Sequence, residues 1–135
     1  MFNEEQRALL EQVTFAKLAT VGPTGAPESM VIWFRLEGDE IRMFSPANLR
    51  KVRNLQRDPR VSLVIEDRDD PYHYLEIRSR AEIISDPSLV GPEMNRIATR
   101  YIGERSGPYL SVRPPESRVL IVVKPEYVRS YNERP

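Results

Sequence analysis

The chain has no cysteine, and its 135 residues include one histidine and one tryptophan. The absence of cysteine excludes disulfides, thiolate metal sites and a cysteine nucleophile. A single histidine leaves no set of side-chain ligands for a zinc or haem-like centre. The formal net charge is zero, so no overall field attracts the chain to nucleic acid or to an anionic membrane. Composition therefore points away from nucleic acid, membrane and metal partners.

Long hydrophobic runs are also missing. No segment reaches the length that spans a bilayer, and the charged start MFNEEQR is followed by no apolar signal region. Hydrophobic residues make up 40% of the chain and charged residues 30%, which is the balance of an ordinary folded domain. We therefore expect a single domain over residues 1–135, located in the cytoplasm.

Alternating apolar and polar residues predict short strands with helices inserted between them. Asn3 and Gln6 fit a capping box for a first helix, whose apolar face would hold Leu9, Leu10 and Val13. We expect strands over 15–21, 28–36, 40–45, 61–66, 72–84, 118–123 and 126–131, and helices ending near Arg57 and over 88–102. This order favours an antiparallel barrel with peripheral helices. A barrel this small is filled by its own side chains, so a large ligand would lie in an outer groove completed by another subunit.

The segment FSPANLRKVRNL, residues 44–55, follows a predicted strand and opens a predicted helix. It places Arg50 and Lys51 in the first helical turn, where unpaired amide groups and the helix dipole are already positive. Two cations there are unfavourable unless an anion binds among the amides. With Ser45 at the strand end, the pattern predicts a phosphate cradle. The alternative is that Arg50, Lys51, Arg53 and Arg57 form the solvated face of a surface helix.

Several segments in a fixed order carry a family resemblance. They are FAKLATV (15–21), GPTGAP (22–27), MVIWF (30–34), the basic helix start, NL with DPRVSL (54–63) and PYHYLEIR (71–78). Together they resemble the pyridoxamine 5′-phosphate oxidase-like split-barrel superfamily, and more narrowly its coenzyme F420-binding branch of flavin/deazaflavin oxidoreductases. The resemblance covers nearly the whole chain. It implies a mainly β split barrel of the FMN-binding-protein type that forms a homodimer with cofactor grooves at the interface.

The resemblance also implies the residues of the groove. The tricyclic ring would lie against the second strand, and the phosphate would bind at the basic helix start. The implied cofactor-binding residues are Ser29, Met30, Val31, Trp33, Ser45, Asn48, Arg50, Lys51, Asn54, Tyr74 and Arg78. Trp33 also has a plain alternative as a core or dimer-interface residue.

Departures from the oxidase pattern bear on the choice of cofactor. The FMN-dependent pyridoxamine phosphate oxidases, which this chain resembles, carry an Arg and a Lys on the second strand. At the corresponding positions this chain has Glu28 and Trp33. A carboxylate would repel the FMN phosphate, and an indole cannot replace a cation. Tyr74 stands where those oxidases use a Gln, and their pyridoxine phosphate signature has no clear match. Coenzyme F420 is therefore expected, with Arg53 or Arg57 near its acidic tail, and FMN is the alternative.

The implied activity is hydride transfer from the reduced deazaflavin to a small-molecule acceptor with an activated double bond, or to a quinone-like or aromatic one. The alternatives are an FMN-dependent oxidoreductase of the same fold and a non-catalytic F420 carrier. Tyr72, His73 and Tyr74 are candidate proton donors, although each also has a packing or interface interpretation. No Ser-His-Asp set and no paired carboxylates are evident, which disfavours hydrolysis.

Overall fold

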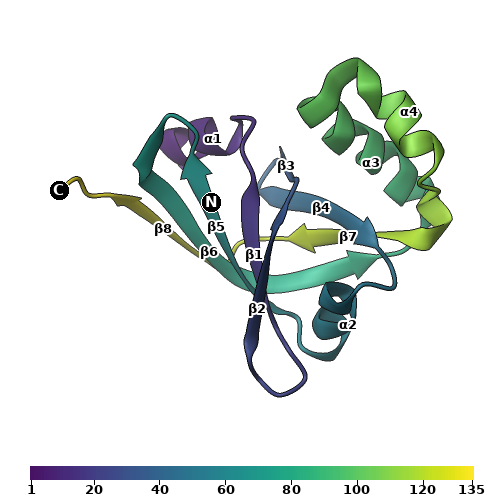
Figure 1. The fold of residues 1–135 in the computed structure, drawn as a ribbon. Coiled ribbons are helices and arrows are strands. Elements are labelled where there is room, and N and C mark those ends of the chain that lie inside the picture. Colours follow the sequence, from purple (N-terminus) through teal and green to yellow (C-terminus); the bar gives the residue numbers. More distant parts are fainter.

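The computed structural model describes residues 1–135, and eight antiparallel strands form one strongly curved sheet with helices at its margins (Figure 1). The strands are β1 (Ala16–Val21), β2 (Pro27–Ile32), β3 (Arg35–Glu37), β4 (Glu40–Pro46), β5 (Arg60–Asp67), β6 (Asp70–Ile84), β7 (Arg118–Val123) and β8 (Tyr127–Asn132). The helices are α1 (Glu4–Leu10), α2 (Arg50–Arg57), α3 (Pro87–Ile102) and α4 (Ser106–Ser111), with short 3-10 turns η1 (Gly103–Arg105) and η2 (Pro115–Ser117). None of these helices combines the length and apolar character needed to cross a membrane.

The strand order β2-β1-β5-β6-β7-β4-β3 confirms the predicted split barrel with peripheral helices. Strand β6 joins the two halves, because it pairs with β5 and β8 along its first part and with β7 at residues 81–84. The sheet ends, β2 and β3, are connected in the chain by Trp33 and Phe34 alone. The barrel is therefore open between β2 and the β3–β4 hairpin.

Alternation along the strands fills the barrel. Leu18 pairs with Leu63, and Leu63 with Ile77, so the three side chains form one inward row with no exposed surface. They belong to a core cluster of 17 buried residues, in which each large apolar side chain is worth roughly 1.5–3 kcal/mol of transfer free energy. A second cluster of Val90, Met94, Leu120 and Val122 attaches α3 to β7. This packing fixes α3 and α4 beside the open side of the barrel (Figure 1).

The first helix confirms the predicted capping box, since the Asn3 side chain accepts from Gln6 N–H and the Gln6 side chain accepts from Asn3 N–H. Leu9 and Leu10 are buried as expected. The placement of Val13 on the helix was wrong, because α1 ends at Leu10 and Val13 is 42% exposed in the following turn.

The single strand expected over 28–36 was also wrong. The chain leaves the sheet at Trp33 and Phe34, between β2 and β3. The Phe34 N–H donates to the Tyr101 hydroxyl at 3.1 Å instead of to a neighbouring strand. The helical turns over 103–117 were not predicted, and they place α4 next to this break.

Candidate functional site

The basic helix start has the form that the sequence predicts. Helix α2 begins at Arg50, its N-cap Leu49 supplies no side-chain hydrogen bond, and its first turn contains no acidic residue. Unpaired amide groups and two adjacent cations therefore meet at the end of β4.

A carboxylate of the chain already binds one of these cations. Glu28 on β2 accepts from Arg50 Nε at 2.9 Å and from Arg50 Nη2 at 2.8 Å. The buried Asn54 amide donates to Glu28 at 2.8 Å and to Thr20 at 3.1 Å. The Arg50 guanidinium, followed by the Asn54 amide, holds the pKa of the Glu28 carboxyl below its usual value. Arg50 and Asn54 are therefore engaged within the chain, at the edge of the predicted cradle.

Lys51 is the free cation of the helix start. It makes no ion pair or hydrogen bond, and burial alone lowers the pKa of its ammonium group. A half-buried ammonium without a counter-ion beside uncapped amides is an unfavourable arrangement that a bound anion would relieve. Lys51 is accordingly the residue of the cradle best placed to hold a phosphate.

Two other cradle residues differ in orientation. Ser45 faces the barrel interior with 1% exposure, and its hydroxyl donates to the Pro46 carbonyl at 2.9 Å. Asn48 is exposed, and its carbonyl accepts from Arg53 Nη1 at 2.6 Å. The structure thus places Asn48 on the open side of the helix start and Ser45 inside.

Strand β2 divides its predicted ring-binding residues between two faces. Ser29 and Val31 point outward, and Val31 is 61% exposed. Met30 points inward and packs against the core. Only Ser29 and Val31 therefore offer side chains to a ligand on the outer face of the sheet.

An apolar cleft lies where β2 leaves the sheet. Its volume is about 250 Å³, and its lining contains no charged side chain. The lining residues are Phe15, Val31, Ile32, Trp33, Phe44, Pro46 and Tyr109. Trp33 forms one wall, with its ring 5.5 Å from that of Tyr109 on α4. Pro46 leads from the cleft along the chain to the start of α2, so the aromatic cleft and Lys51 lie at either end of one short segment.

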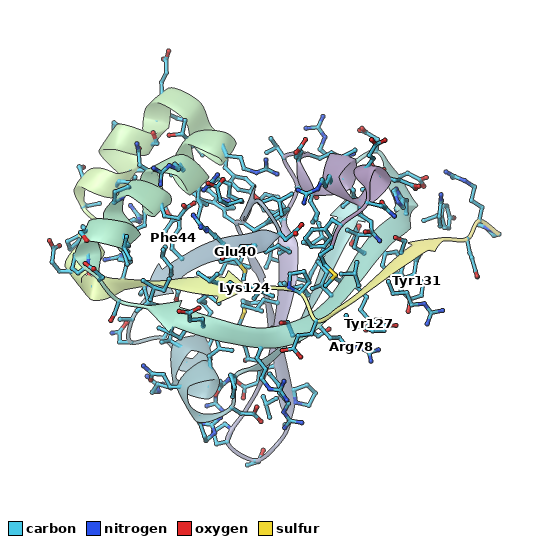
Figure 2. The ribbon with its side chains drawn as sticks, turned by 180° about the vertical axis from the view of Figure 1, so that it is seen from behind. Glu40, Phe44, Arg78, Lys124, Tyr127 and Tyr131 are labelled. Carbon is cyan, nitrogen blue, oxygen red and sulfur yellow. The ribbon has the colours of Figure 1, made fainter.

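The β6 residues proposed for the groove lie on a separate part of the outer face. Tyr74 stacks on Tyr131 with ring centroids 4.6 Å apart, and the Arg78 guanidinium lies 4.7 Å from the Tyr127 ring centre. Figure 2 shows Arg78, Tyr127 and Tyr131 together on β6 and β8, away from Phe44. Strand β6 is three strands from β2, which is a path of about 14 Å along the sheet. One chain therefore does not bring Tyr72, Tyr74 and Arg78 to the cleft.

His73 lies on the inner face of β6, opposite to Tyr72 and Tyr74. It is 8% exposed, with Nδ1 3.1 Å from Asp67 Oδ2 and Nε2 3.3 Å from Glu5 Oε1. These contacts connect α1 to the β5–β6 hairpin, and the imidazole has no access to the cleft lining.

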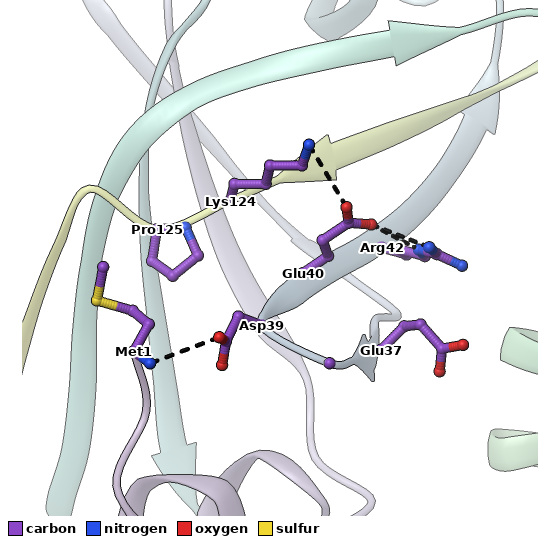
Figure 3. A pocket seen from close by; sticks show the side chains of 8 residues that line it. Met1, Glu37, Asp39, Glu40, Arg42, Lys124 and Pro125 are labelled. Carbon is purple, nitrogen blue, oxygen red and sulfur yellow. Dashed lines mark hydrogen bonds and ion pairs between the residues drawn. The ribbon is translucent and has the colours of Figure 1, made fainter.

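The largest cavity, about 600 Å³, lies elsewhere, at the β3–β4 turn (Figure 3). Its charged groups are all paired. Glu40 is 2.9 Å from Arg42 and 3.7 Å from Lys124, Asp39 is 3.5 Å from the terminal amine of Met1, and Glu37 is 3.0 Å from Arg35 outside the lining. The structure contains no group of three or more potential metal-ligating side chains.

Sequence reasoning missed five lining residues of the cleft, namely Phe15, Ile32, Phe44, Pro46 and Tyr109. Phe15, Ile32 and Phe44 lie within the strands expected over 15–21, 28–36 and 40–45, and Pro46 directly follows the last of these. The strand pattern therefore gave a usable signal for all four. Tyr109 had none, since it lies on a helix that the sequence did not predict.

Comparison with known proteins identifies similar chains. The pyridoxamine 5′-phosphate oxidase family matches residues 2–132. A solved structure named F420 reductase is 33% identical with a TM-score of 0.82, covering 95% of this chain and 98% of that one. The conserved hypothetical protein Rv2991 of Mycobacterium tuberculosis is 27% identical with a TM-score of 0.79, covering 99% of this chain and 87% of that one.

A more distant structure shares the fold. General stress protein 26 of Bacillus anthracis is 19% identical with a TM-score of 0.72, covering 95% of this chain and 92% of that one. Among curated proteins, no match is found.

Proposed function

This chain belongs to the pyridoxamine 5′-phosphate oxidase family, and from that premise we propose that it is a coenzyme F420-dependent oxidoreductase. The family and the F420 reductase neighbour support an oxidoreductase-like function. The F420-dependent activity is proposed on that neighbour and on the residues of the cleft and the helix start.

The single observation that carries the proposal is the unpaired Lys51 at an uncapped helix start, one short segment away from an aromatic cleft. Such a pair of features fits a ligand with an anionic end and a flat, apolar end. Lys51 and the first amides of α2 would hold the phosphate. Trp33, Phe15 and Val31 would cover the ring and exclude water from one of its faces.

When bound, the reduced deazaflavin supplies a hydride to an activated double bond, a quinone-like compound or an aromatic acceptor. The side chains of this protein hold the ring in place and leave a face open to the acceptor. Tyr109 brings the one hydroxyl of the cleft lining, and it is the candidate proton donor within the same chain.

The structure alters one argument about the cofactor. Glu28 was expected to repel the phosphate of FMN, but its charge is compensated by Arg50. The preference for F420 over FMN therefore depends on Trp33 and on the similar F420 reductase. FMN remains the alternative cofactor.

We also propose that two copies complete the site. The cleft, at about 250 Å³, is smaller than the roughly 300–1,000 Å³ of typical ligand sites, so it lacks a wall. The outer sheet face exposes Val31, Tyr72 and Tyr127. Packing this face on a second copy would cover these side chains and bring Tyr74 and Arg78 of that copy toward the groove. Light scattering with size-exclusion chromatography should give twice the chain mass of 15.7 kDa, and a monomer would contradict this proposal.

Titration with F420 and with FMN, followed by Trp33 fluorescence, tests the function. Lys51→Ala should weaken F420 binding roughly tenfold or more, because charge-assisted bonds to phosphate are strong. Lys124→Ala is the matched control: Lys124 follows β7 and pairs with Glu40 at the start of β4, away from the helix start, so its loss should leave the affinity unchanged. Equal affinity in the Lys51 variant and the wild type would overturn the cradle, and tighter binding of FMN would overturn the cofactor choice.

A turnover assay distinguishes an enzyme from a non-catalytic F420 carrier. Reduced F420 should be oxidised by the protein with at least one quinone-like or activated-alkene acceptor. Binding of F420 without turnover across a broad acceptor panel would instead support the carrier.

A further inference from the structure

We infer that Tyr101, a residue outside the cleft, is the positioning residue that sets the spacing of the two aromatic walls of the cleft, Trp33 and Phe15. The inference concerns the site of the proposed function and depends on it for the identity of the ligand. Tyr101 lies in the last turn of α3, and it is absent from the cleft lining.

The Tyr101 ring stacks against both Trp33 and Phe15, the two aromatic walls. Its centroid is 4.9 Å from that of Trp33 with the planes 5° apart, and 5.7 Å from that of Phe15 with the planes 13° apart. Phe15 precedes β1, whereas Trp33 follows β2, so the two walls come from different strands. Both walls therefore pack against the same ring, which ties the position of each to Tyr101.

The Tyr101 hydroxyl binds the backbones that carry both walls. It donates to the Thr14 carbonyl at 2.6 Å, and the Phe34 carbonyl is a second acceptor at 3.2 Å. The same oxygen accepts from the Phe34 N–H at 3.1 Å. One phenol thus connects the residue before Phe15 to the residue after Trp33.

Two further facts make this connection firm. Burial raises the pKa of the Tyr101 phenol, so the hydroxyl remains a donor at neutral pH. The neighbouring Arg100 donates to the carbonyls of Leu10 at 3.0 Å and Glu11 at 3.1 Å, and to that of Gln12, where α1 ends. Two adjacent residues at the end of α3, Arg100 and Tyr101, therefore hold the backbone segment that leads to Phe15.

The test uses Trp33, the only tryptophan of the chain, in the ligand-free protein. Tyr101→Phe keeps the ring stack but removes the three hydroxyl contacts, and Tyr101→Leu removes both. We expect the acrylamide quenching of Trp33 fluorescence to rise about twofold in the first variant and further in the second. Tyr131→Phe removes a hydroxyl that contacts Glu76 on the other part of the sheet, and it should leave the quenching unchanged.

Ligand-binding measurements then distinguish the effect of the aromatic wall from that of the phosphate-binding end. The phosphate-free probe 8-hydroxy-5-deazariboflavin keeps the ring and its ribityl chain but has no phosphate, so Lys51→Ala should not alter its affinity. Tyr101→Phe should weaken this probe and F420 by the same factor, about tenfold. Circular dichroism and a urea titration give the folded fraction of each variant under the assay conditions.

Unchanged Trp33 quenching in both Tyr101 variants would overturn the inference. Altered quenching with unchanged affinity for the phosphate-free probe would also overturn it, because the position of Trp33 would then have no effect on ligand binding. If the wild type binds neither F420 nor FMN, the proposed function fails, while the quenching result still decides whether Tyr101 positions Trp33.

Discussion

Glu28 holds Arg50 with both carboxylate oxygens, at 2.8 and 2.9 Å, across the junction of β2 and α2. The anion that the basic helix start requires is thus partly supplied by the chain. This pairing removes Arg50 from the set of free cations and leaves Lys51. Of the two adjacent cations that the sequence predicted for the cradle, only Lys51 therefore lacks a partner within the chain.

Neutralising Glu28 should free the positive charge of Arg50 for a bound anion. In Glu28→Gln the Arg50 guanidinium loses its ionic partner and becomes available beside Lys51. We expect F420 to bind roughly three- to tenfold more tightly, because a phosphate gains a charge-assisted partner. Fluorescence titration measures this change, and Glu37→Gln, which neutralises an exposed carboxylate on β3, serves as the control. Weaker binding in Glu28→Gln would show that Arg50 must be held by Glu28 to act.

The buried carboxylate of Glu93 should contribute strongly to stability. It is 2% exposed, and it accepts from Arg35 at 2.7 Å and from Arg42 at 3.0 Å. Burial alone would raise the pKa of this carboxyl, but the two guanidinium groups outweigh it and lower the pKa. Glu93→Gln should reduce the free energy of unfolding by about 3 kcal/mol, since it breaks a buried ion pair, although Arg35 and Arg42 keep Glu37 and Glu40 as partners.

Urea unfolding measures the Glu93 effect. The lowered pKa means that the carboxylate stabilises the fold at neutral pH and that this contribution is lost as the pH falls through its folded-state pKa. The difference between Glu93→Gln and the wild type should therefore shrink in acid. A difference that persists unchanged below that pH would contradict the ionic interpretation.

Asp58, which follows α2, gives a direct pH measurement. Hydrogen bonds from the Arg60 side chain, and then from its backbone N–H, lower the pKa of the Asp58 carboxyl from 3.8 to about 2. Its stabilising contribution is therefore complete above pH 3.8 and is lost as the pH falls toward 2. Carboxyl NMR titration should find the midpoint near the lower value, and Arg60→Ala should move the midpoint upward. A midpoint that does not move would exclude Arg60 as the cause.

His73 should be dispensable for turnover. Its imidazole faces the barrel interior and contacts Asp67 and Glu5, so it does not reach the cleft. His73→Gln should retain the rate of reduced F420 oxidation within roughly twofold. Tyr109→Phe, measured in the same assay, should reduce the rate if its hydroxyl is the proton donor. A large loss of rate in the His73 variant, with unchanged cofactor affinity, would restore His73 as the donor.

Local patterns predicted much of the fold. The capping box at Asn3 and the start of α2 at Arg50 depend on residues a few positions apart, and both are confirmed. Contacts between residues far apart in the sequence could not be predicted from local patterns. The Glu28–Arg50 pair spans 22 positions, and the break at Phe34 depends on Tyr101, 67 positions away. In both cases a side chain from another element decides what a local pattern leaves open.

The shared strand β6 has a consequence for how the protein unfolds. Its 15 residues hydrogen-bond to β5 and β8 in one half of the sheet and to β7 in the other. Neither half can separate from the other while this strand keeps its partners. Cooperative units seen by hydrogen exchange coincide with such contiguous elements. The two halves should therefore lose their protection together, with the central amides of β6 exchanging only through global unfolding.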